Sequence, residues 1–162
     1  MIRILLPLAI VAAIFLGPFF SETTSGSATG DRVSTVTGSY FIGEAVDCVR
    51  NMQFAELAFG DACASDAEYN GSKMPGTLLS GAAKLSLLAA VLGVIGILPF
   101  IGRLTSIVTT LAGLATLGGV GYFIMSAMSV DEGLASVQWG AYLAGGLALL
   151  TLISGLSGMR GR

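Results

Sequence analysis

The chain has 162 residues, of which 54% are hydrophobic and 11% are charged, and it contains no histidine. Ordinary soluble domains carry roughly 25% charged residues, so this composition is typical of an integral membrane protein. The length fits one domain, and a net charge of −2 provides no basic surface for nucleic acid. Without histidine, the chain lacks the commonest ligand of haem and transition metals and the usual general base.

Four apolar runs predict the fold class. Each has the roughly 17 to 25 mostly apolar residues that a membrane-spanning helix needs. We therefore expect an all-α membrane protein, a bundle of four transmembrane helices with a large first extracytoplasmic loop. The expected spans are 1–20, 85–101, 104–128 and 137–157, and the loop is 21–84.

The first run has a second interpretation. Arg3 before an apolar stretch is typical of a secretory signal peptide, and the small residues 26–28 offer a cleavage site. The apolar stretch 4–20 is longer than the roughly 7 to 15 residues of a signal core, which favours an uncleaved anchor.

Charge predicts the orientation of the spans, because Lys and Arg are retained on the cytoplasmic side of short loops. All ten carboxylates fall in the loop 21–84 or the turn 129–136. We therefore expect both termini in the cytoplasm and residues 21–84 in the periplasm or outside the cell. The Ala- and Gly-rich helices favour the plasma membrane of a bacterium. The arginines that flank the spans on the opposite side are Arg3, Arg103, Arg160 and Arg162.

The two cysteines, Cys48 and Cys63, both lie in the expected outer loop. In an oxidising compartment two cysteines have one possible pairing. A disulfide there closes a loop of about 15 residues and stabilises the fold by roughly 3 kcal/mol. A redox-active or metal-binding pair is the alternative, but it calls for C-x-x-C spacing or histidine partners. We expect a structural disulfide and no metal.

Other parts of the loop have recognisable patterns. Residues 44–59 hold no Gly or Pro and repeat apolar residues at helical spacing, which predicts a helix that ends before Gly60. From Cys48 to residue 59 that helix rises about 16 Å, whereas the four residues back to Cys63 reach at most about 14 Å. The full helix and the disulfide therefore compete. "RVSTVTGSYFI" predicts a strand or hairpin, and "SETTSGSATGD" a flexible linker.

Small residues form a stripe on two of the expected spans. Such stripes let helix backbones approach closely in lipid, either within the chain's own bundle or against a partner's helix. The expected packing residues are Gly140, Ala144, Ala148, Thr151 and Gly155 on the last span and Thr105, Thr109, Ala112, Thr116 and Gly119 on the third.

Charged and aromatic residues mark the expected membrane interfaces. Lys84 borders a span, and it either snorkels to the interface or contacts a lipid or quinone head group. Phe19, Phe20, Tyr122 and Phe123 gather at the outer side. The expected interface anchors are Lys84, Arg103, Trp139 and Tyr142.

The order of loops resembles that of claudin-like tetraspan proteins, with inside termini, a cysteine pair in a large first outer loop and a very short inner turn at Gly102-Arg103. Claudins carry a Trp and a Gly-Leu-Trp before two cysteines, whereas the corresponding stretch here is "YFIGEAVDC". The resemblance therefore implies the fold, and paracellular sealing is not carried over. Quinone-linked thiol-oxidising membrane proteins are similar in size and topology, but their C-x-x-C does not occur in this chain.

These patterns predict a non-catalytic accessory or structural subunit of a larger membrane complex, which docks through its helices and outer loop. We expect no enzyme activity and no cofactor. The expected partners are membrane lipids and either integral membrane proteins or copies of the chain. Two alternatives stay open: a claudin-like self-associating adhesion or barrier protein, and a thiol- or lipid-linked membrane enzyme.

Overall fold

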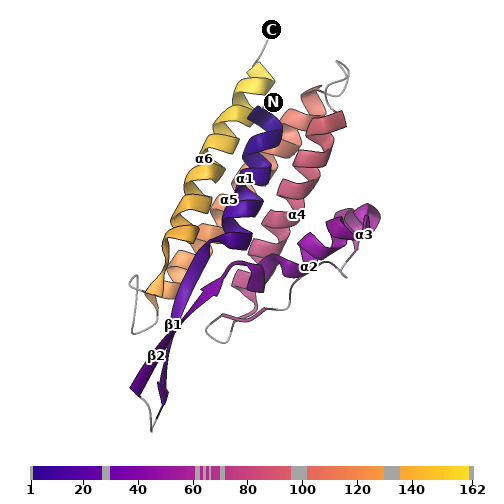
Figure 1. The fold of residues 1–162 in the computed structure, drawn as a ribbon. Helices are drawn as coiled ribbons and strands as arrows, with labels where there is room; N and C mark the ends of the chain where they lie inside the picture. Colours follow the sequence, from indigo (N-terminus) through magenta and orange to yellow (C-terminus); the bar gives the residue numbers. More distant parts are fainter. Residues whose placement is uncertain are drawn as a thin grey trace.

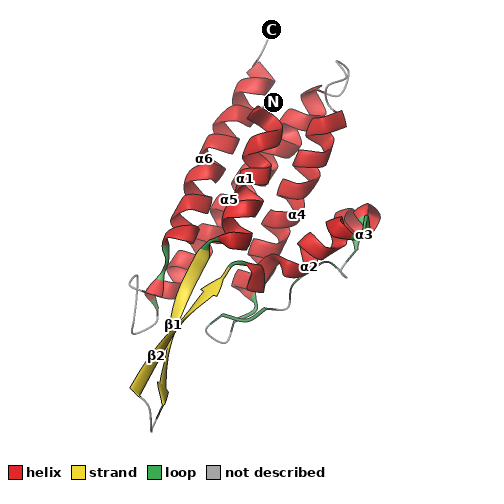
Figure 2. Ribbon diagram, in the orientation of Figure 1, coloured by secondary structure: helices red, strands yellow, loops and turns green. Residues whose placement is uncertain are grey.

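The computed structural model describes residues 2–26, 30–60, 63, 65, 67–69, 72–95, 102–129 and 136–160. Helices α1, α4, α5 and α6 run side by side, a two-stranded hairpin projects from one end of them, and α2 and α3 extend sideways (Figures 1 and 2). Helix α1 begins and α6 ends at the end opposite the hairpin. The elements in chain order are α1 (Ile2–Leu16), β1 (Pro18–Gly26), β2 (Gly30–Thr37), α2 (Ser39–Arg50), α3 (Phe54–Phe59), α4 (Met74–Ile95), α5 (Gly102–Met128) and α6 (Trp139–Arg160).

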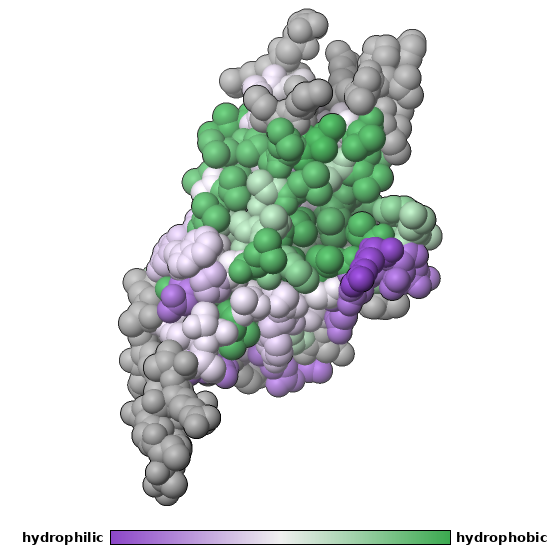
Figure 3. Space-filling view, in the orientation of Figure 1, coloured by the Kyte–Doolittle hydropathy of each residue, from purple (hydrophilic) through white to green (hydrophobic). Residues whose placement is uncertain are grey.

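Three helices are long and apolar enough to cross a membrane, namely the parts Met74–Val94 of α4, Thr105–Met128 of α5 and Trp139–Gly158 of α6. This suggests a membrane protein, as the composition predicts. Hydrophobic side chains cover these helices, and hydrophilic ones gather near the hairpin and beside α2 and α3 (Figure 3). Exposed apolar residues on the helices include Leu5, Leu8, Ile107, Leu111, Leu114, Leu149, Leu150 and Ile153.

Helix α1 is apolar but shorter than the other three, and it corrects the expected first span 1–20. It ends at Leu16, and Phe19 and Phe20 belong to strand β1. Gly17 and Pro18 explain the early end, because Pro lacks the backbone N–H that would continue the helix. Helix α1 still packs along α4 and α6.

Helix α4 corrects the boundary between the expected loop 21–84 and the expected span 85–101. It begins at Met74, so residues 74–84 are helical and Lys84 lies inside the helix. Pro75 favours this start, because its fixed φ suits the first helical turn. The described part of α4 ends at Ile95, and the predicted helical residues 96–101 lie outside the described residues.

The other two spans agree with the sequence to within a few residues. Helix α5 covers the expected span 104–128 and also includes Gly102 and Arg103. Helix α6 covers most of 137–157 and continues to Arg160. A continuous apolar run without an internal charge was therefore sufficient to locate these two helices.

The hairpin confirms a strand over the first part of the predicted stretch 32–42, where residues 32–37 belong to β2. The prediction is wrong for the end of that stretch, because Ser39 begins α2. The hairpin also corrects the predicted linker 21–31. Strands β1 and β2 are antiparallel, with Phe20 opposite Val36 and Glu22 opposite Ser34. The stretch from Ser21 to residue 26, expected to be flexible, is strand, and 27–29 lie outside the described residues. Its threonines suit a strand as well as a linker, because β-branched residues favour extended backbone.

Helix α2 is amphipathic. Its outer face carries Glu44, Asp47 and Arg50, which are exposed. The apolar face packs toward α4 and α1. The buried residues on that face are Phe41, Ile42, Ala45 and Cys48.

Five aromatic side chains join the hairpin, α2 and α5 at the base of the helices. The ring centroids of Tyr69 and Phe123 are 4.8 Å apart, and those of Phe20 and Tyr69 are 4.9 Å apart. Phe19 and Phe41 complete the cluster. All five are buried, so Phe19, Phe20 and Phe123 pack in the core instead of lying at the membrane interface, where the sequence placed them.

Three glycines allow the chain to pass closely between α1, the hairpin and α6. The Gly38 N–H donates a hydrogen bond of 3.1 Å to the Gly17 carbonyl. A Cβ atom on Gly38 would lie 2.8 Å from the carbonyl carbon of Ile14, and one on Gly140 would lie 3.0 Å from the Gly17 Cα. Neither space accepts a methyl group without movement of the backbone.

We expect Gly38→Ala to lower the free energy of unfolding by about 1 to 3 kcal/mol through overpacking. Gly38 has φ −65° and ψ −11°, which alanine adopts readily, so the loss reflects contact and not backbone conformation. Gly43→Ala is the control, because a Cβ there meets nothing within 4 Å. Alanine is also more stable than glycine inside a helix, so this change should raise the free energy of unfolding by about 0.5 to 1 kcal/mol. Thermal unfolding in detergent, followed by circular dichroism, measures both. Equal melting temperatures for the two variants would contradict the close contact.

Candidate functional site

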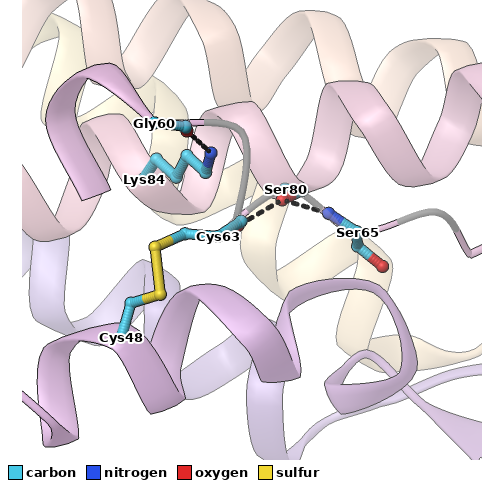
Figure 4. Close-up of a disulfide and its surroundings, with 6 residues drawn as sticks. All are labelled: Cys48, Gly60, Cys63, Ser65, Ser80 and Lys84. Atoms are coloured by element: carbon cyan, nitrogen blue, oxygen red, sulfur yellow. Dashed lines mark hydrogen bonds between the residues drawn. A yellow bond between two sulfur atoms is a disulfide. The ribbon is translucent and has the colours of Figure 1, made fainter. Parts of the chain in front are cut away.

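A disulfide joins α2 to the segment that leads into α4. Cys48 lies on the buried face of α2 and is bonded to Cys63, with an S–S distance of 2.06 Å and Cα atoms 6.1 Å apart (Figure 4). The predicted disulfide is therefore confirmed. Both cysteines are buried, Cys63 completely, and such shielding is typical of a structural bridge.

The helix predicted over 44–59 breaks to make room for this bond. Helix α2 ends at Arg50, and α3 starts at Phe54. Between them the Gln53 N–H donates to the Cys48 carbonyl at 2.8 Å, and Met52 has a positive φ of 57°. A continuous helix would carry the chain too far from Cys48 for a four-residue return, so the break resolves the competition seen in the sequence.

Ser80 on α4 holds the segment around Cys63 from the opposite side. Its hydroxyl accepts a 3.1 Å hydrogen bond from the Ser65 N–H and donates one of 3.4 Å to the Cys63 carbonyl (Figure 4). Ser65 and Ser80 are both buried. The Ser80 hydroxyl thus supplies hydrogen bonds to two backbone groups, the Ser65 N–H and the Cys63 carbonyl, which lie outside the helices and strands.

Lys84 adds a third bond one helical turn further along α4. Its ammonium donates a 3.1 Å hydrogen bond to the carbonyl of Gly60, the residue after α3 (Figure 4). Residues four apart share one face of a helix, so Ser80 and Lys84 act on the same side of α4. The six residues that make these contacts, here called the loop anchor, are Cys48, Gly60, Cys63, Ser65, Ser80 and Lys84.

The loop anchor fixes the arm, the name used here for α2, residues 51–53 and α3. Two large apolar side chains of the arm point to solvent, Met52 with 79% and Phe54 with 42% of their surface exposed. Arg50 and Asn51 beside them are also exposed. The arm therefore carries a mixed apolar and polar outer surface in a fixed position.

The predicted small-residue stripes are buried inside the chain, at contacts that include those of α5 with α6 and α4 and that of Gly140 with Gly17. A Cβ on Gly155 would lie 2.9 Å from the Thr110 nitrogen, and one on Gly119 would lie 3.3 Å from the Leu78 carbonyl oxygen. Thr109 and Thr151 bond their hydroxyls to carbonyls one turn earlier, which lets them be buried. The ten buried residues are Gly140, Ala144, Ala148, Thr151, Gly155, Thr105, Thr109, Ala112, Thr116 and Gly119.

The expected interface anchors occupy different surroundings. Trp139 and Tyr142 are exposed in the first turn of α6, with 60% and 50% of their surface free. Lys84 lies within α4 and belongs to the loop anchor. Arg103 lies in the first turn of α5, and its side chain is outside the described part of the structure.

An open groove of about 420 Å³ runs between α4 and α5. Its walls are mostly apolar and small, and Lys84 is the charged residue in them. A Cβ on Gly81 or Gly118 would meet nothing within 4 Å, so the groove is open at both. Within the described residues, no group of three His, Cys, Asp or Glu side chains could hold a metal ion.

Sequence reasoning missed Ser80, the strained residue Met52 and the groove. Ser80 and Lys84 are polar residues four apart in an apolar stretch, a spacing that could have indicated a shared polar contact. No signal indicated Met52, because Asn51 beside it is the residue type that adopts positive φ more readily.

The comparisons with known proteins identify no relative: no family model, curated protein or solved structure matches the chain.

We expect Ser80→Ala to lower the free energy of unfolding by about 1 to 3 kcal/mol, because it leaves the buried Ser65 N–H unpaired. Ser86→Ala is the matched control on the same helix. The Ser86 hydroxyl is equally buried but has no hydrogen-bond partner among the described residues, so its removal should be neutral or stabilising. Thermal unfolding of the purified protein distinguishes the two, and a loss of the same size in both variants would contradict the anchoring role of Ser80.

Proposed function

We propose that this chain is a non-catalytic accessory subunit of a larger integral membrane complex. In this proposal α1, α4, α5 and α6 all span a bacterial plasma membrane, both termini are cytoplasmic, and the hairpin and the arm are extracytoplasmic. The apolar surfaces of α4, α5 and α6 support the membrane location. The cytoplasmic termini follow from the flanking arginines, and α1 starts at the same end of the molecule as α6 ends.

The observation that carries the proposal is the outer surface of the arm around Met52. Its exposed side chains include Tyr40, Arg50, Met52 and Phe54. Tyr, Phe, Met and Arg are the residues enriched at protein interfaces. Four such residues on the arm are consistent with a contact surface for another protein.

The backbone at Met52 supports the same conclusion. Its φ of 57° is uncommon for a residue other than glycine, and such strain persists only where the surroundings hold it. The disulfide at Cys48 restrains the chain before Met52, and the bond from Lys84 on α4 to Gly60 restrains it after Met52. Because the arm is fixed before a partner arrives, association loses less conformational entropy than with a flexible loop.

A second candidate, a self-associating barrier protein, is favoured by the hairpin. Its two strands pair with each other, and a bridge from Phe20 to Val137 ties β1 to the start of α6. A two-stranded ribbon leaves outer edges that another strand can pair with, including one from a second copy. The buried disulfide gives less support to the thiol-linked enzyme, because a redox-active pair needs access to its reaction partner.

We expect Met52→Asn to separate stability from assembly. Asparagine tolerates positive φ, so Met52→Asn should leave the free energy of unfolding unchanged or raise it by up to about 1 kcal/mol. The melting temperature should therefore not fall. Loss of the exposed Met side chain should remove the chain from its complex. Purification from native membranes in a gentle detergent, followed by native mass spectrometry, measures which proteins remain bound.

Met74→Asn is the control, because Met74 is also exposed but belongs to α4 and not to the arm. It should leave the complex intact. Recovery of the wild-type chain alone would contradict the proposal, as would recovery of Met52→Asn with its partner at the wild-type ratio. Recovery only with copies of itself would favour the barrier protein instead.

A further inference from the structure

Lys84 has no carboxylate partner among the described residues. It lies about 15 Å along α4 from Met74, at the level where α3 lies beside that helix (Figure 1). The acceptor that it has is a neutral carbonyl, that of Gly60. Within the described part of the chain the ion pair that forms is between Lys73 and Glu68. A charge that is partly taken out of water is normally paired.

The acid of the arm next to Gly60, Glu56, occupies a different position. The Glu56 carboxylate lies against the Cα of Gly60, where a Cβ would be, and forms no ion pair with Lys84. An ammonium has three N–H donors, and the Gly60 carbonyl takes one of them. Two donors therefore remain for an anion.

The groove beside Lys84 provides the apolar part of a binding site. Leu78, Leu85 and Leu88 form its walls on α4, and Ala115 and Gly118 face them from α5. Its volume of about 420 Å³ falls in the range of roughly 300 to 1,000 Å³ typical of small-molecule sites. A long acyl chain fits walls of this kind, because it needs no hydrogen bonds.

We propose that this groove binds an anionic phospholipid, with its phosphate at Lys84 and an acyl chain between α4 and α5. A phospholipid carries the missing negative charge and the apolar chain in one molecule. Exposed Glu56 of the arm lies against Gly60, so a polar group lies at the level of Lys84, where a head group can be hydrated.

The test uses the full chain in nanodiscs of equimolar phosphatidylcholine and phosphatidylglycerol. After detergent extraction, native mass spectrometry measures the lipid retained by each variant. The wild type should retain phosphatidylglycerol in preference to phosphatidylcholine. Lys84→Gln should lower that retention by about tenfold or more, because a charged hydrogen bond is lost, whereas Lys84→Arg should keep it.

A second pair of variants keeps Lys84 and its bond to Gly60. Gly118→Leu fills the groove and should abolish retention, while Gly121→Leu, at an equally open position on α5 outside the groove, should leave it unchanged. Equal retention of the two lipids, or equal retention by the two leucine variants, would overturn the proposal. So would a photo-crosslinker at Gly118 in native membranes that captures a protein, or a second copy of the chain, instead of a lipid.

Discussion

The structure depends on one constraint, the attachment of Cys63 and its neighbours to two helices at once. The disulfide fixes this segment to α2, and the Ser80 hydroxyl fixes it to α4. Without both, the arm would be joined to the rest by its flanking chain, by the apolar face of α2 and by the bond from Lys84 to Gly60. With both, α3 lies beside the middle of α4 (Figure 1), and the exposed side chains of the arm have a defined place beside the long helices.

Close packing of small residues holds the long helices against one another. The helices carry little amphipathic character, so contact between them relies on shape, as at Gly155 against Thr110 and at Gly119 against Leu78. The aromatic cluster around Phe123 then closes the base of the helices and connects it to the hairpin and α2. Small residues therefore serve the contacts between the long helices, and large aromatic residues serve the junction with the hairpin and α2.

The sequence was sufficient for features that depend on composition or on a single possible pairing, such as helices α5 and α6 and the disulfide. It failed where tertiary contacts override a local pattern. Lys84 suggested a helix end, but α4 already begins at Met74. Lys84 lies within that helix, where its ammonium bonds the Gly60 carbonyl. Phe19 and Phe20 suggested a continued span, but Gly17 and Pro18 end α1 before them. The groove could not be predicted, because it depends on the distance between two helices.

The state of Cys48 and Cys63 in native membranes tests the central claim most directly. Peptide mapping under non-reducing conditions should find the two cysteines linked within one chain. Because either single change opens the same loop of sequence separation 15, Cys48→Ser should destabilise the protein as much as the double replacement does, by roughly 3 kcal/mol. Free thiols at both positions, with a melting temperature unchanged by Cys48→Ser, would contradict the account.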